Sequence, residues 1–240
     1  MGDKYAEKSI DRAAGRMLFL AEQSGIETAW DRLDKQEPQC GFGLLGICCR
    51  NCNMGPCRID PFGSGAQKGV CGADADTIVA RNLLRTIAAG AAAHSDHGRD
   101  IVETLLHAAK KEAPDYTIKD EGKLLALAGE LKVSSEGRST AEIAMDIAQK
   151  ALDEFGTSKG NLEFMGRLPA ARKELWEKLG IVPRGIDREI VEIMHRTTMG
   201  VDTDYVNLIL QGLRASLSDG WGGSMWATEL SDVLFGTPNL

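Results

Sequence analysis

The sequence has few aromatic residues, no cysteine after position 71 and no long apolar run. Phe, Trp and Tyr make up only 5% of the 240 residues. No stretch approaches the roughly 20 apolar residues of a membrane-spanning helix. The charged N-terminal segment also lacks the apolar core of an export signal. These absences predict a cytoplasmic protein without a transmembrane segment.

The chain is also poor in positive charge. It carries 28 Lys and Arg against 35 Asp and Glu, which gives a formal net charge of −7. Nucleic-acid binding usually needs a basic face. No basic stripe with interleaved aromatic residues occurs, so a nucleic-acid partner is not expected.

Runs of alternating β-branched residues are almost absent, so little sheet is expected. Apolar residues instead recur at helical spacing, which predicts an all-α fold with a cysteine-rich loop near its N-terminal end. We expect N-terminal helices over 1–37, a cluster-binding loop over 38–73 and a helical domain over 74–240. The expected helices cover 10–21, a segment from about 74, 100–111, 121–131, 140–155, 169–179, 187–198 and 203–218.

The helix that begins near residue 74 is the most distinctive of these. Asp74 or Asp76 is a suitable N-cap, and Gly98 is expected to interrupt the helix. Small residues over 88–93 would let it approach another backbone or a bulky cofactor closely. The residues expected to face inward are Ile78, Val79, Leu83, Leu84 and Ile87.

All six cysteines fall within 32 residues, in the pattern C-x7-C-C-x2-C-x4-C-x13-C. In a reducing compartment such a group binds metal more often than it forms disulfides. Zinc is the alternative to iron–sulfur, but zinc sites commonly use two short knuckles and this pattern has one. Three close cysteines and a distant fourth are typical of iron–sulfur loops. The six are Cys40, Cys48, Cys49, Cys52, Cys57 and Cys71.

Counting ligands divides the six into two groups. One [4Fe–4S] cluster needs four thiolates, and these can be Cys49, Cys52, Cys57 and Cys71. Cys40 and Cys48 would then complete a second cluster only if a two-fold axis doubled them in a dimer. The alternative is that both are buried thiols without metal.

Two arginines, Arg50 and Arg58, stand beside the predicted ligands. They could offset the negative charge of a cluster and tune its potential. They could equally be solvated surface residues, and the sequence does not decide between these readings.

The stretch from Cys40 to about Gly98 resembles the N-terminal region of the anaerobic nickel–iron carbon monoxide dehydrogenases. The resemblance lies in CGFGLLGICCRNCNMGPCRIDPFG and GVCGADADTIVARNLLRTIAAGAAAHSDHGRD, and DGWGGSMWATELSDVLFGTP helps to extend it to nearly all 240 residues. It implies a homodimeric oxidoreductase that converts CO and water to CO2, two protons and two electrons. It also implies that this chain is the N-terminal part of a longer enzyme.

The resemblance assigns the cysteines to named clusters. Cys49, Cys52, Cys57 and Cys71 match the ligands of the [4Fe–4S] B cluster. Cys40 and Cys48 match those of the D cluster, which the two subunits share. Their seven-residue separation is similar to that of family members whose D cluster is [4Fe–4S] rather than [2Fe–2S].

The family's nickel–iron–sulfur C cluster is held by later αβ domains, and its ligands are not in this chain. The 240 residues alone are therefore not expected to oxidise CO. The implied partners are a second copy, a ferredoxin-type electron acceptor and an acetyl-CoA synthase subunit. The other hypothesis is a zinc- or cluster-stapled structural module without redox activity.

Four histidines complete the candidate residues. His94 and His97 share one helix face, and the resemblance implies that they belong to a proton path from the C cluster. Asp100 stands where some family members have a further histidine, which leaves His107 as a substitute. His195 is expected to be structural.

Overall fold

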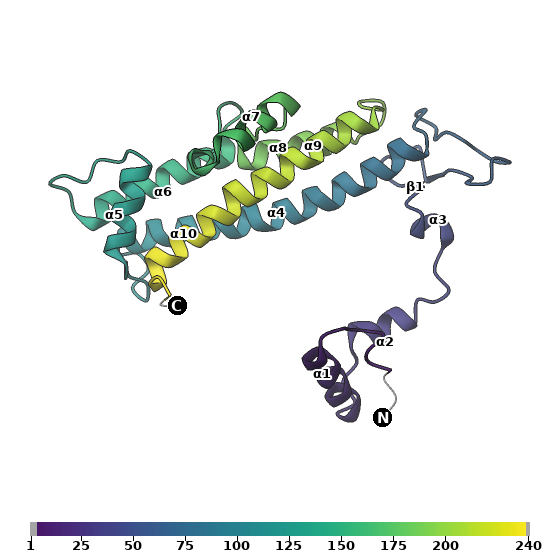
Figure 1. Cartoon of the computed structure of the whole chain (residues 1–240), viewed down its shortest axis with the longest axis horizontal. Coiled ribbons are helices and arrows are strands. Elements are labelled where there is room, and N and C mark those ends of the chain that lie inside the picture. Colours follow the sequence, from purple (N-terminus) through teal and green to yellow (C-terminus); the bar gives the residue numbers. More distant parts are fainter. Residues whose placement is uncertain (1–3, 239–240) are drawn as a thin grey trace. The chain divides into compact units, whose positions relative to one another are not determined.

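The computed structural model describes residues 4–238 and divides the chain into two compact units, Met1–Leu45 and Gly46–Leu240. Figure 1 shows the whole chain as a ribbon coloured along the sequence. The fold is helical, as predicted, and its strands are a single pair of two-residue segments within the described residues. No helix over residues 4–238 has both the length and the apolar character needed to cross a bilayer.

The first unit consists of short helices with well-formed N-termini. Asp11 caps the first helix by accepting a hydrogen bond from the Ala13 N–H at 2.8 Å. Thr28 and Asp31 form a reciprocal capping box at the second, which satisfies backbone donors that a helix start leaves unpaired. None of the three helices has a buried residue. They are α1 (Arg12–Gln23), α2 (Ala29–Asp34) and α3 (Gly41–Leu44).

The second unit is organised around one long helix, α4 (Ala75–Ala109), of 35 residues. At 1.5 Å per residue it is about 50 Å long. Asp74 is its N-cap and accepts a hydrogen bond from the Thr77 N–H at 2.9 Å. The expected interruption at Gly98 is wrong, because the helix runs through it. A Cβ at Gly98 would lie 2.6 Å from the Gly223 carbonyl oxygen, so this glycine permits a close helix contact.

Four other helices of the second unit pack along α4. In Figure 1, α9 and α10 follow one another beside it, and α4 also contacts α6 and α8. A π-helical turn over Asp219–Gly223 joins α9 to α10. The remaining elements are α5 (Glu121–Glu130), α6 (Thr140–Gly156), a 3-10 turn (Glu163–Arg167), α7 (Ala170–Leu179), α8 (Ile186–Arg196), α9 (Tyr205–Ser218) and α10 (Ser224–Phe235).

Most helix predictions are confirmed to within about two residues at each end, the usual uncertainty of helix boundaries. The predicted inward face of α4 needs a correction. Ile78 and Leu84 are buried, but Val79 and Leu83 are 41% and 48% exposed. Residues 79 and 83 are four apart and share a face. That face of α4 points away from the core. The face that packs into the core carries the buried residues Ile78, Arg81 and Leu84.

Candidate metal centre

The cysteine segment begins with a small antiparallel hairpin. Strand β1 (Cys48–Cys49) pairs with β2 (Cys57–Arg58), so that Cys49 lies opposite Cys57. Successive side chains of a strand point to opposite faces, so Cys48 and Cys49 are directed apart. The Asn82 amide of α4 donates hydrogen bonds to the carbonyls of Gly46 and Cys48, at 2.8 and 3.0 Å. The hairpin is therefore anchored to the first turns of α4.

A second turn brings Cys71 back to the hairpin. The Gly69 N–H donates to the Ala73 carbonyl at 2.7 Å, and the Val70 N–H donates to Cys57 Sγ at 3.4 Å. A Cβ at Gly69 would lie 3.5 Å from the same sulfur. Backbone and sulfur are thus in close contact here, as expected of a loop that presents N–H groups to thiolates.

Four of the cysteines line one small cavity: Cys49, Cys52, Cys57 and Cys71. These are the four that the ligand count assigned to one cluster. Ile78 and Arg81 of α4 and Thr197 and Met199 after α8 line the same cavity. The wall therefore combines a cysteine loop with segments that come more than a hundred residues later in the sequence.

The other two predicted ligands lie outside this lining. Cys48 lies in β1 opposite Arg58. Cys40 belongs to the first unit, where it is exposed and precedes α3 as its N-cap residue. A site shared by Cys40 and Cys48 stays a prediction.

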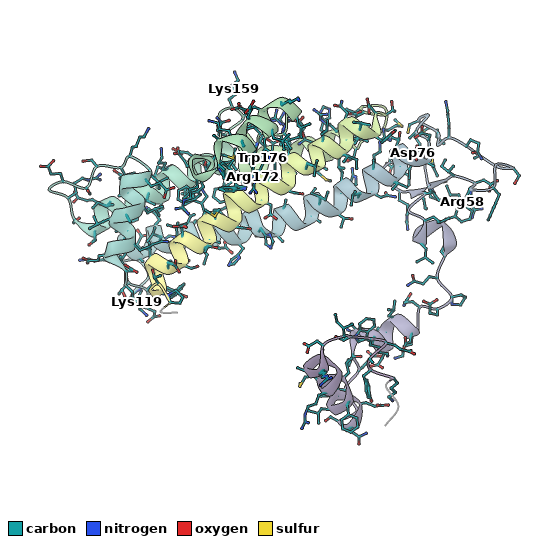
Figure 2. The ribbon with its side chains drawn as sticks, in the orientation of Figure 1. Arg58, Asp76, Lys119, Lys159, Arg172 and Trp176 are labelled. Carbon is teal, nitrogen blue, oxygen red and sulfur yellow. The ribbon has the colours of Figure 1, made fainter. Side chains whose placement is uncertain are left out.

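Arg81 is a residue of the cavity lining that the sequence interpretation missed. Its side chain is 1% exposed, and one guanidinium nitrogen lies 3.5 Å from Cys71 Sγ. Arg50 and Arg58, the arginines singled out in the sequence, are both exposed. Figure 2 labels Arg58 at the end of the second unit where α4 begins. The sequence could have pointed to this residue, because Arg81 falls between Ile78 and Leu84 at a position that the helical pattern directs inward.

The Cys71 thiol is polarised by its surroundings. Burial raises its pKa, but hydrogen bonds from the Ala73 N–H, the Arg81 guanidinium and the Gly200 N–H outweigh burial and lower the pKa below its ordinary value. The thiolate is the form that binds metal. Cys71 is therefore prepared to act as a ligand.

The cavity also gathers unpaired hydrogen-bond donors. Across residues 4–238, three buried side-chain polar atoms have no hydrogen-bond partner, and two of them, Asn51 Nδ2 and Arg81 Nε, belong to residues that line this cavity. Within the same residues, no three His, Cys, Asp or Glu side chains converge as a single metal ion would require. Four thiols and two unpaired donors around a cavity suit an anionic group with several acceptor atoms, as an iron–sulfur cluster is.

Three of the histidines lie on α4, and none of them lines this cavity. His94 follows Arg81 by 13 residues, about 20 Å along the helix axis. His94 Nδ1 lies 2.8 Å from Asp219 Oδ1, at the start of the π-helical turn. His97 is exposed, and His107 Nδ1 lies 2.8 Å from Glu112 Oε2.

His195 is exposed on α8. Its carbonyl accepts a hydrogen bond of 2.6 Å from the Thr198 hydroxyl, at the point where the helix ends. It does not line the cysteine cavity.

Comparison with known proteins decides the family. Residues 47–240 match the model of the Prismane/CO dehydrogenase family. The chain belongs to this family. It is 64% identical over 97% of its length to carbon monoxide dehydrogenase 1 of Methanosarcina mazei, of which it covers 37%. Crystal structures of the family include a Ni-free carbon monoxide dehydrogenase from Thermococcus sp. AM4, which superposes with a TM-score of 0.88 at 56% identity over 95% of this chain and 36% of that one.

A further relative is the beta subunit of carbon monoxide dehydrogenase/acetyl-CoA synthase from Moorella thermoacetica. It is 41% identical over 99% of this chain and 36% of its own length. The chain thus spans little more than a third of these CO dehydrogenases. The family resemblance predicted from the cysteine segment is therefore confirmed over nearly the whole chain.

Proposed function

We propose that this chain is the electron-transfer part of an anaerobic CO dehydrogenase, which oxidises CO with water to CO2 and releases two electrons. The observation that carries the proposal is the cavity lined by Cys49, Cys52, Cys57 and Cys71 in a member of the CO dehydrogenase family. These four residues would hold the [4Fe–4S] B cluster. Such a cluster, when bound, accepts and gives up one electron at a time.

The second cluster of the proposal needs two copies of the chain. Cys40 and Cys48 would contribute two thiolates from each copy to a [4Fe–4S] D cluster on the two-fold axis. The position of Cys48 on the face of β1 opposite to Cys49 supports its assignment to a different site. Cluster binding and dimer formation would then be linked.

The C cluster, with its nickel, would be held by the part of the relatives that this chain does not span. No cysteine follows Cys71, so we propose that the 240 residues do not turn over CO on their own. His94, oriented by Asp219, and His97 would belong to a path for the protons that the reaction releases.

The partners follow from the same proposal. A ferredoxin-type protein in the cytoplasm would accept the electrons. The name of the Moorella relative, a subunit of a CO dehydrogenase/acetyl-CoA synthase, supports an acetyl-CoA synthase subunit as a further partner.

The experiment is anaerobic preparation of the chain with measurement of iron, sulfide, zinc and visible absorbance. We expect about six irons per chain, four from B and half of a four-iron D, and broad absorbance that bleaches with dithionite. Colourless protein with stoichiometric zinc would instead establish the structural module. Iron without bleaching would contradict the electron-transfer role.

A further inference from the structure

We propose that Arg81 sets the reduction potential of the cluster in the cysteine cavity by holding a fixed positive charge beside Cys71. This inference rests on the proposed function and adds a positioning and tuning residue to it. Arg81 is no ligand. It would act on the cluster through charge and through N–H groups directed at sulfur.

The first argument is the burial of a permanent charge. An arginine side chain stays protonated in proteins, and an isolated buried charge is strongly unfavourable. Arg81 is 1% exposed. Over residues 4–238 its hydrogen-bond partners are Cys71 Sγ and the Asp202 carbonyl, and no carboxylate pairs with it. The compensating negative charge must therefore come from the thiolates and the group that they hold.

The second argument is the unpaired donor. The Arg81 Nε–H group is buried without an acceptor among the described residues, and leaving such a group unpaired costs about 1–3 kcal/mol. The side-chain nitrogen Nδ2 of Asn51 is likewise buried without an acceptor among the described residues. Both side chains line the cavity. The sulfur atoms of a bound cluster would supply acceptors to both.

The third argument is that the guanidinium is held in place. Its second terminal nitrogen donates to the Asp202 carbonyl at 2.5 Å. The loop that carries Asp202 is itself held by two contacts. The Thr77 hydroxyl donates to the Thr203 carbonyl at 2.8 Å, and Arg196 pairs with the Asp202 carboxylate at 3.4 Å. The charge therefore cannot swing out to solvent, as the exposed Arg50 can.

The consequence is a bias toward the reduced cluster. Reduction transfers one electron from an external reductant such as dithionite to the cluster and makes the cluster more negative by one charge. A buried positive charge stabilises that product more than the oxidised form. N–H donors to the sulfurs act in the same direction.

The test uses the anaerobically prepared, cluster-loaded protein and an EPR-monitored redox titration. The signal to follow is the one that Cys52→Ala removes. Arg81→Gln keeps amide donors but loses the charge, and Arg81→Lys keeps the charge. The matched control is Arg50→Gln, which removes an exposed charge next to the ligands.

We expect Arg81→Gln to lower the ratio of reduced to oxidised cluster at a fixed potential at least about tenfold, which is 59 mV for one electron. Arg81→Lys should stay within about threefold of the wild type, and Arg50→Gln should not differ from it. An unchanged midpoint in a fully loaded Arg81→Gln protein would overturn the proposal, as would equal shifts in the Gln and Lys variants.

Two further outcomes are also decisive. If Arg81→Gln fails to retain iron, a loaded Arg81→Lys protein decides: a shift of tenfold or more refutes the role of the charge, and a smaller shift supports it. A wild-type protein that binds no iron would instead refute the proposed function, which separates the two failures.

Discussion

Trp226 donates a hydrogen bond of 2.6 Å from its indole nitrogen to Oε2 of Glu154 in the interior of the second unit. The other oxygen of Glu154 accepts from the Glu163 N–H. The Trp226 ring also packs against Phe164, with ring centroids 4.7 Å apart. A titratable carboxyl group is thus built into the main apolar core.

This carboxyl group predicts a pH-dependent stability. Burial raises the pKa of Glu154 to about 7, against the opposing hydrogen bonds from Trp226 and Glu163. Because the folded pKa lies above the unfolded value of 4.5, the folded state binds this proton more tightly. The stabilisation is therefore complete below about pH 4.5 and is lost as the pH rises through about 7.

Glu154→Gln should remove this dependence. At 1.36 kcal/mol per pKa unit, the stability of the wild type relative to the variant should fall by about 3 kcal/mol between pH 4.5 and pH 8. Denaturant unfolding at several pH values measures it, with exposed Glu174→Gln as the control. A difference between wild type and variant that does not change with pH would contradict the prediction.

Two glycines of α4 should respond to alanine in opposite directions. A Cβ at Gly98 would meet the Gly223 backbone, whereas one at Gly90 has nothing within 4 Å. We expect Gly98→Ala to destabilise the protein by about 1–3 kcal/mol through overpacking. Gly90→Ala should stabilise it by up to about 1 kcal/mol through helix propensity. Thermal or denaturant unfolding gives both values, and equal effects would refute the assigned contact.

The cysteine assignments predict two separable losses of iron. Cys52→Ala should remove about four irons per chain and leave the dimer intact, because it disrupts a cluster within one chain. The double variant Cys40→Ala, Cys48→Ala should remove about two per chain and weaken the dimer. Iron analysis and sedimentation provide the measurements. A double variant with full iron content would exclude the bridging site.

His94 should affect turnover without affecting the clusters. In an enzyme that joins these residues to the remaining length of the relatives, His94→Ala removes the imidazole held by Asp219. We expect slower CO oxidation, while dithionite still reduces the B and D clusters. His195→Ala, which removes an exposed imidazole of α8 that is expected to be structural, serves as the control. Equal slowing by both variants would argue against a specific role for His94.

Local patterns predicted most of the helices because capping residues and apolar periodicity are encoded in neighbouring positions. Asp74 and the inward Ile78 are examples. Gly98 was misread because its role depends on Gly223, 125 positions away. Spacing likewise grouped the four cysteines that share a cavity, but it could not reveal Arg81, whose meaning depends on how α4 approaches Cys71.

The loop from Thr197 to Asp204 has a consequence for biosynthesis. Cys49 to Cys71 emerge from the ribosome early, but Thr197 and Met199 of the cavity wall and the Asp202 carbonyl that fixes Arg81 emerge more than a hundred residues later. The cavity around the four cysteines therefore lacks part of its wall until that loop has been made and has docked on α4. The cysteines are made first, and the site that they line is completed by residues that are made much later.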